Sequence, residues 1–199
     1  MKGAINLARR APLLTNEASV TRYVGPYIQA AVALNPELCL TPEKDLAGRW
    51  GSGDLDYGIE SRYATKSYVV GAVEVKKEDT YIGAFQQNAM QLDAALTTRD
   101  TRYSYNKLKP LISYGIITDA ERWEFLECRL EPMEATDIIQ GPPIIRKAKL
   151  PVIVKYDKEN WADDAQEVFE YILWVVELMS QGLPSTKRIK GNDRLTKEP

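Results

Sequence analysis

Hydrophobic residues recur at helical spacing in three stretches of the chain. The first follows Asn16, a residue type that often caps helix N-termini, the second covers residues 84–96, and the third covers about residues 160–181. Apolar side chains lie three or four positions apart in each stretch, as they do on one face of a helix. We therefore predict three amphipathic helices, the first of them kinked or split at Pro26, because proline interrupts the helical hydrogen-bond ladder.

Between these helices, alternating or valine-rich apolar runs predict β-strands. The four candidates cover residues 54–61, 67–77, 111–118 and 122–130. Residues 35–53 instead contain two prolines and three glycines, which indicates a loop with at most a short strand. Residues 132–151 hold four prolines and predict a surface excursion, with an edge strand at 144–145 or at 152–154.

Length and composition indicate one folded domain. The chain has 199 residues, of which 44% are hydrophobic, enough to bury a sizeable core. We expect four segments: an N-terminal extension (1–14), the core (15–131), a C-terminal loop and helix that pack on the core (132–183), and a basic tail (184–199).

The absence of histidine restricts the chemistry most. It excludes Ser-His and Cys-His nucleophiles, His-ligated zinc hydrolases and imidazole bases. The two cysteines, Cys39 and Cys128, match no metal-ligand spacing and give no sign of a disulfide framework, so we expect a reducing compartment. With no signal peptide or membrane-spanning stretch evident, we expect an intracellular protein of the nucleus or cytoplasm that has no membrane partner.

One strand candidate places a carboxylate beside an ammonium. Side chains alternate along a strand, so Glu74 and Lys76 point to the face opposite Val75. In the preceding strand candidate, Asp54 and Asp56 share one face in the same way. If the two strands pair, they form an acidic pocket that contains one lysine.

Such a pocket suits Mg²⁺ or Mn²⁺, because hard divalent cations prefer carboxylate, water and phosphate oxygens. Lys76 could hold or help to deprotonate an attacking water, or donate to a phosphate. The alternative is an ordinary solvated strand face, on which Glu-x-Lys is common. Asp54 is also an alternative to Asp56 as the acidic residue of the first strand.

Several short motifs follow one another in a defined order. They are Gly53-Asp54-Leu55-Asp56-Tyr57, Val73-Glu74-Val75-Lys76-Lys77, Gln87 with Gln91, Tyr114-Gly115-Ile116-Ile117-Thr118-Asp119, and Trp123-Glu124-Phe125. In this order they resemble the PD-(D/E)XK nuclease superfamily, and within it the fungal and oomycete members that include Crinkler-type effector domains. The resemblance covers about residues 15–130.

The resemblance implies an α/β, restriction-endonuclease-like fold, in which a central mixed β-sheet with an αβββαβ-type core is flanked by helices and followed here by an extra C-terminal helix. It also implies Asp56 and Glu74 as metal ligands and Lys76 as the catalytic lysine. Glu17 matches a further metal-binding glutamate, although a carboxylate is favoured at any helix N-terminus. We favour Gln87 as the supporting catalytic glutamine, with Gln91 second or in contact with nucleic acid.

The connection after the second helix is basic and aromatic. Its cations are Arg99, Arg102, Lys107 and Lys109, with Tyr103 and Tyr105 between them. Such a segment can follow a phosphate backbone and stack a base, but it can equally be a solvated loop.

We therefore predict a Mg²⁺- or Mn²⁺-dependent nuclease whose partner is nucleic acid, DNA rather than RNA, cleaved with low sequence specificity. The sequence is also compatible with a homodimer. The alternative is a catalytically silent domain of the same fold that binds nucleic acid or a protein.

Overall fold

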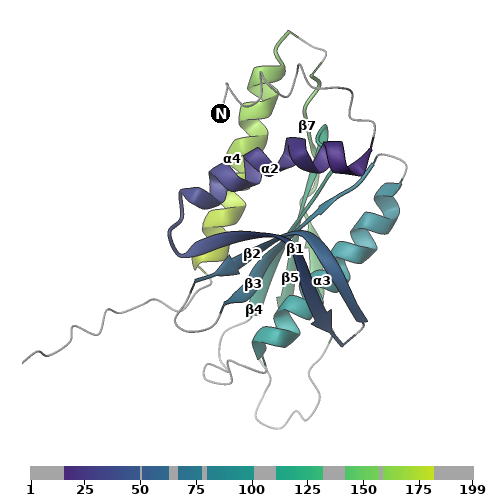
Figure 1. Cartoon of the computed structure of the whole chain (residues 1–199), viewed down its shortest axis with the longest axis vertical. Helices are drawn as coiled ribbons and strands as arrows, with labels where there is room; N and C mark the ends of the chain where they lie inside the picture. The colour runs from purple at the N-terminus through teal and green to yellow at the C-terminus, as the bar shows by residue number, and fades with distance from the viewer. Residues whose placement is uncertain are drawn as a thin grey trace, which may run out of the picture.

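The computed structural model describes residues 16–49, 51–62, 67–77, 80–100, 111–131, 142–156 and 159–181. Within these ranges the chain forms three helices and seven strands (Figure 1). In chain order they are α2 (Glu17–Ala33), β1 (Leu38–Gly48), β2 (Gly51–Ser61), β3 (Tyr68–Val75), α3 (Tyr81–Asp100), β4 (Leu111–Thr118), β5 (Arg122–Leu130), β6 (Ile144–Lys147), β7 (Val152–Ile153) and α4 (Trp161–Gln181).

All seven strands belong to one mixed sheet in the order β1-β2-β3-β4-β5-β6, with β7 pairing to β5. The β3–β4 pair is parallel, and the other pairs are antiparallel. A parallel pair requires a crossover connection, which α3 supplies. The prediction of a mixed α/β sheet flanked by helices is therefore confirmed.

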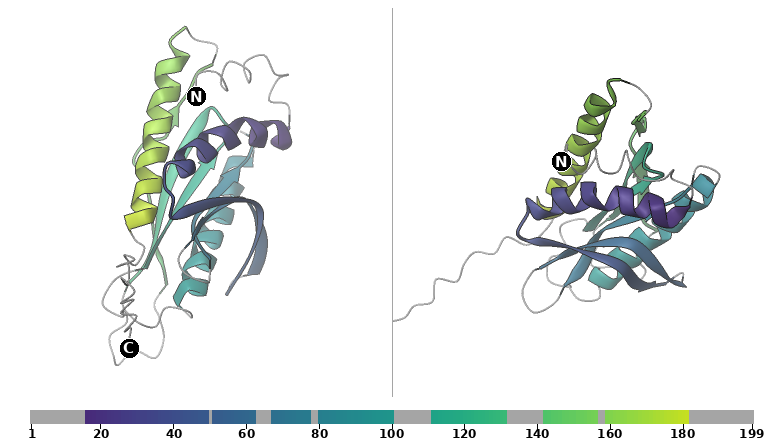
Figure 2. Two further views of the ribbon diagram at one scale, coloured as in Figure 1. Left: turned by 60° about the vertical axis from the view of Figure 1, so that its left-hand side comes forward. Right: turned by 45° about the horizontal axis from the view of Figure 1, so that its top comes forward.

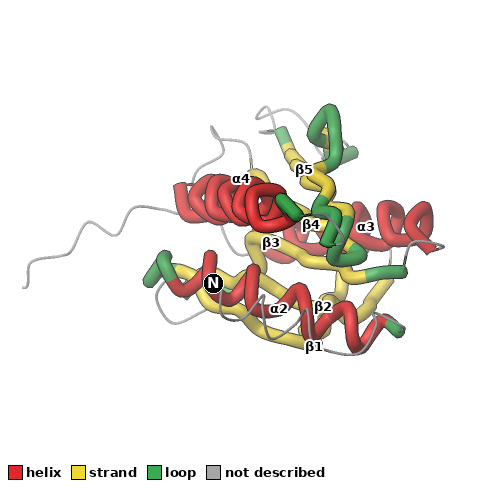
Figure 3. Tube along the Cα trace, turned by 90° about the horizontal axis from the view of Figure 1, so that it is seen from above, coloured by secondary structure: helices red, strands yellow, loops and turns green. Residues whose placement is uncertain are grey.

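Helices α2 and α4 cover one face of the sheet and α3 covers the other (Figures 2 and 3). One core cluster joins α2 and α4 to apolar side chains such as Val73, Val75 and Trp123. A second joins α3 to Leu55, Ile117 and others. The centre of the sheet is thus covered on both faces, and β3 is buried along its entire length, whereas β6 is exposed.

Helix α2 runs through Pro26 without interruption, so the predicted division into two helices is wrong. Pro26 is exposed, whereas Val24 and Ile28 on the opposite side are fully buried. The proline therefore removes one hydrogen bond on the solvent side, while packing of the apolar face holds both halves in place.

The loop predicted for residues 35–53 is also wrong, because β1 occupies most of it and pairs with β2 from Leu38 to Gly48. As the outer strand of the sheet, β1 can accommodate Pro42. Gly48 is required for a different reason: a β-carbon there would collide with Ala94 of α3. The prolines and glycines that indicated a loop instead adapt an edge strand to its neighbours.

The C-terminal part follows the predicted pattern closely. Both candidate edge segments form strands, as β6 and β7, where one or the other was expected. All the apolar positions predicted for the core-facing side of α4 are buried: Trp161, Ala165, Val168, Ile172, Val175 and Met179. Residues 1–14 and 184–199 lie outside the described residues. Among the described helices, none has the length and apolar character to cross a membrane.

Candidate functional site

Two acidic side chains meet where β2 separates from β3. Tyr57 pairs with Val73, so Asp56 and Glu74 are the next residues along the two antiparallel strands. The Asp56 Oδ2 atom accepts a hydrogen bond from the Val75 backbone N–H at 2.7 Å. This bond holds the Asp56 carboxylate against β3, beside Glu74.

The Glu74 side chain is only 1% exposed and has a defined partner for each oxygen. Its Oε1 atom lies 2.7 Å from the Lys76 ammonium, and its Oε2 atom accepts a hydrogen bond of 2.8 Å from Gln91 Nε2. Val73 and Val75 are fully buried in the core cluster formed with α2 and α4. The alternation expected from the sequence therefore separates the charged groups of β3 from its apolar packing.

Glu17 reaches this cluster from α2. Lys76 donates to Glu17 Oε1 at 3.0 Å, so its ammonium bridges two carboxylates. A capping box between Asn16 and Ser19 sets the start of α2 and thereby places Glu17 in the first turn. The Glu17 side chain is 48% exposed, in contrast to the buried Glu74.

Burial raises the pKa of both central carboxyl groups. For Glu74 the loss of solvation outweighs the hydrogen bonds from Lys76 and Gln91, and the nearby Asp56 raises the pKa further. For Asp56 burial likewise outweighs the hydrogen bond from Val75. An additional cation would therefore stabilise the ionised form of both groups.

The pKa of Lys76 is raised as well. Burial alone would lower it, but the contacts with Glu74 and Glu17 outweigh burial. The Lys76 ammonium thus donates to both carboxylates.

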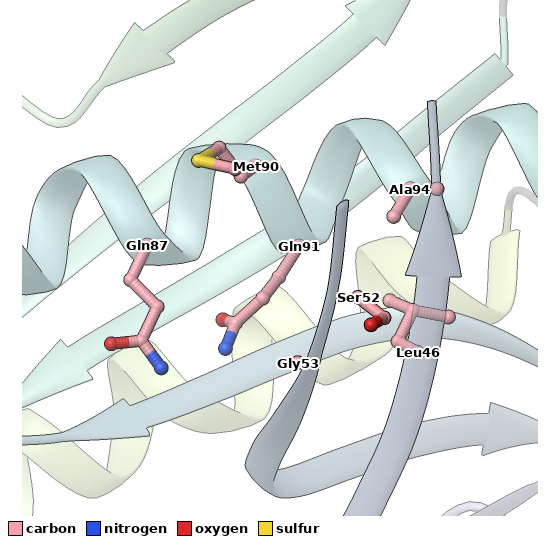
Figure 4. A pocket seen from close by; sticks show the side chains of 8 residues that line it. Leu46, Ser52, Gly53, Gln87, Met90, Gln91 and Ala94 are labelled. Carbon is pink, nitrogen blue, oxygen red and sulfur yellow. The ribbon is translucent and has the colours of Figure 1, made fainter. Parts of the chain in front are cut away.

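Gln91, and not the favoured Gln87, is the glutamine that contacts Glu74. Gln91 is 6% exposed, and its Nε2 atom also donates to the Asp54 backbone carbonyl at 3.2 Å. Gln87 lies one turn earlier on α3, and its amide points toward the strands on the same side as that of Gln91 (Figure 4). The amide of Gln91 is thus held against β2 and β3, and its assignment as a nucleic-acid contact stays a prediction.

The structure separates Asp56 from its alternative, Asp54. Asp54 is exposed and lies opposite Asp45 of β1. The hydrogen bond with Asp45 and its negative charge raise the pKa of Asp54. Asp54 therefore contributes its backbone carbonyl to the cluster through Gln91, while Asp56 contributes a carboxylate.

The cluster offers two carboxylates that could take part in holding a divalent cation. Within the described ranges, no three His, Cys, Asp or Glu side chains form a group able to hold a metal. Mg²⁺, however, is often bound by one or two carboxylates together with waters and phosphate oxygens. Asp56 and Glu74 supply two such carboxylates, both with raised pKa values.

The basic residues expected to contact nucleic acid fall into two groups. Arg99 lies in the last turn of α3, not in the connection, and is 4% exposed. Its guanidinium donates to the Ile112 carbonyl at 2.7 Å and lies over the Tyr68 ring at 5.0 Å. Its assignment as a surface phosphate contact is therefore corrected to a packing role. The other three, Arg102, Lys107 and Lys109, lie outside the described residues.

Glu124 is another buried carboxylate, and it was not among the residues predicted from sequence. Glu74 pairs with Ile117 of β4, and Ile117 pairs with Glu124 of β5. Glu124 is 1% exposed and forms ion pairs with Arg122 at 2.6 Å and Lys147 at 2.5 Å. Its position within Trp123-Glu124-Phe125, between two aromatic residues of a strand, was the available signal.

Comparison with known proteins gives one informative likeness. No family model matches the chain. Over 167 residues, 83% of its length, the chain is 31% identical to Crinkler effector protein 1 of Rhizophagus irregularis. The chain spans about one third (33%) of the length of that protein. This likeness supports a Crinkler-like relationship.

Proposed function

We propose that the chain is a divalent-metal-dependent nuclease that hydrolyses phosphodiester bonds, DNA in particular, with low sequence specificity. The observation that carries the proposal is the contact of Lys76 with Glu74 directly beside Asp56, where one buried carboxylate, one partly buried carboxylate and one ammonium lie together. The order α2-β1-β2-β3-α3-β4 is the αβββαβ order expected for a PD-(D/E)XK, restriction-endonuclease-like core. The likeness to a Crinkler effector protein agrees with the same resemblance.

Asp56 and Glu74 would hold the ion, with Glu17 available from α2. A bound Mg²⁺ or Mn²⁺ would orient an attacking water and neutralise charge that develops on the phosphoryl group. Gln91 fixes the orientation of the Glu74 carboxylate by donating to Oε2. The Asp56 carboxylate is held in turn by the Val75 N–H.

Lys76 would act as a donor. Its ammonium is already charged in contact with Glu74 and Glu17, which raise its pKa. In the proposed reaction it would hold the attacking water or donate to a phosphate oxygen, an electrostatic role that is strongest where water is excluded.

A catalytically silent domain of the same fold is the second candidate. The observation that favours it is that the relative is described as an effector, a term that names no reaction. Such a domain would bind nucleic acid or a protein through the same surface and would cleave nothing.

The test is cleavage of plasmid DNA, single-stranded DNA and RNA with Mg²⁺, with Mn²⁺ and with a chelator. We expect metal-dependent cleavage by the wild type and its loss in Glu74→Gln, which preserves the shape of the side chain but removes its charge. An equally active Glu74→Gln would assign the activity to another site. A folded wild type that cleaves none of these substrates with either metal would favour the silent domain.

A further inference from the structure

A cavity opens next to the carboxylate cluster, between α3 and the ends of β1 and β2 (Figure 4). It encloses about 90 Å³ and is open to solvent. Its walls include Leu46, Gly53, Gln87, Met90, Gln91 and Ala94.

One side chain is shared by the cavity and the cluster. Gln91 lines the cavity, and its Nε2 atom donates to Glu74 Oε2 at 2.8 Å. A group bound in the cavity would therefore lie one side chain away from the carboxylate that we propose as a metal ligand. It would belong to a nucleotide adjacent to the cleaved phosphodiester.

The lining fits an uncharged, flat ring with a polar edge. None of the lining side chains carries a charge, and Leu46, Met90 and Ala94 provide apolar surface. Methionine sulfur in particular makes favourable contacts with aromatic rings. A phosphate would find no cation in this cavity, whereas the face of a nucleobase would find apolar side chains.

Gln87 would contact the polar edge of such a ring. The Gln91 amide is already engaged, through Nε2 with Glu74 and Asp54 and through Oε1 with Asn88. Gln87 lies one turn away, and its amide points toward the strands from the same side of α3 (Figure 4). A glutamine amide offers both a donor and an acceptor to a base edge.

We infer that this cavity receives one unpaired nucleobase of the substrate strand, and that the protein therefore prefers single-stranded or unstacked nucleic acid. The inference rests on the proposed nuclease function, because it takes the cluster as the position of the phosphodiester. A base within a duplex is paired and stacked, so it enters such a pocket only after leaving the stack.

Gly53 offers a direct way to fill the cavity. A β-carbon at Gly53 would meet nothing within 4 Å. Gly53 also pairs with Leu46, so a side chain there would point to the same face as Leu46, which lines the cavity. Gly53→Leu should therefore occupy the cavity without displacing its neighbours. Gly83→Leu is the matched control, because Gly83 also has open space around it and does not line the cavity.

The experiment measures binding of a fluorescent oligothymidylate and of a DNA duplex, with a chelator present. We expect Gly53→Leu to weaken oligothymidylate binding about tenfold or more, the scale of losing one stacked base, and to leave duplex binding unchanged. Gly83→Leu should bind both like the wild type. Gln87→Ala should also weaken oligothymidylate binding. If Gly53→Leu does not fold, the inference is tested by whether Gln87→Ala binds oligothymidylate more weakly than the wild type.

Equal binding of oligothymidylate by the wild type and by folded Gly53→Leu would overturn the inference. An equal loss for duplex and single strand would overturn it as well, because the cavity would then lie under bound duplex. Since binding is measured without metal, a protein that shows the expected difference but never cleaves would refute the nuclease proposal and leave the base pocket in place.

Discussion

The Lys76 ammonium lies 2.7 Å from the buried carboxylate of Glu74, two residues away on the same segment. The same ammonium contacts Glu17 at 3.0 Å and so connects the end of β3 to the start of α2. Lys76 offsets negative charge in a site where burial raises the pKa of two carboxyl groups.

Removing the ammonium should slow cleavage in a protein that still folds, and should also lower its stability, because the buried Glu74 carboxylate loses its cation. We expect Lys76→Ala to reduce the cleavage rate by ~10²-fold or more, the usual scale for a positioned electrostatic or acid-base group. The Lys76 side chain lies outside the apolar clusters, so its removal opens no core cavity. Lys77→Ala, at the exposed neighbouring position, is the control and should cleave normally. Equal rates for Lys76→Ala and the wild type would exclude Lys76 from the reaction.

Metal binding should stabilise the protein through Asp56. Two carboxyl groups with raised pKa values favour an added cation, so Mg²⁺ or Mn²⁺ should raise the melting temperature of the wild type. Asp56→Asn should abolish this shift in melting temperature. Asp54→Asn, which changes an exposed residue two positions earlier on β2, should retain it. Thermal unfolding with and without metal measures both. An identical shift in Asp56→Asn would place the ion elsewhere.

Without metal, the charge on Glu74 should make stability depend on pH. Burial raises the pKa of folded Glu74 above its usual value of 4.5, so the folded protein binds more protons than the unfolded chain between the two values. The free energy of unfolding should therefore fall as pH rises through this window, and it should remain lower at higher pH. Glu74→Gln lacks this dependence, so its free energy of unfolding should rise relative to wild type across the window.

Urea unfolding in a chelator, from acidic to neutral pH, provides this comparison. The pKa of Asp56 is raised as well, so both curves also contain a contribution from Asp56. Parallel stability curves for the two proteins would show that the carboxyl group of Glu74 is not perturbed by burial.

The stability costs of removing the two cations that pair with the buried Glu124 should not add up. Arg122→Ala or Lys147→Ala alone leaves one of the two ion pairs and should cost about 1 kcal/mol. The double variant removes both cations from a carboxylate that is 1% exposed, and should cost about 3 kcal/mol or more. Adding Glu124→Met to the double variant should recover stability in urea unfolding. If the stability losses of the two single variants add up to the loss of the double variant, solvent must stabilise the unpaired Glu124 carboxylate.

Two cations assigned to nucleic acid by sequence should behave differently. Lys107→Ala should weaken binding about equally across sequences and lower the slope of log K against log salt by about 1, as losing one phosphate contact does. Arg99→Ala should leave that slope unchanged and reduce stability by about 1–3 kcal/mol, because its guanidinium donates to the Ile112 carbonyl inside the fold. Salt titrations of binding and urea unfolding separate the two effects.

The positions of Glu74 and Lys76 could be predicted from sequence because they depend on local backbone geometry. Alternation along a strand places both opposite Val75, whatever the strand packs against. Helical spacing likewise predicted the buried positions of α4, since 3.6 residues per turn determine which side chains share a face. Such patterns repeat over several residues and are therefore legible without a structure.

Only the tertiary structure decided which glutamine contacts Glu74. Gln87 and Gln91 are equivalent by helical spacing, and the choice depends on where α3 lies along β3 and β4. That position is set by close packing: the amide of Asn88 donates to Ala72 O, and a side chain on Gly115 would collide with it. Burial of Arg99 and pairing of β1 also depend on distant partners. Sequence alone thus determined the local alternation of charged and apolar groups, whereas contacts between distant segments were decided by packing, which no local period encodes.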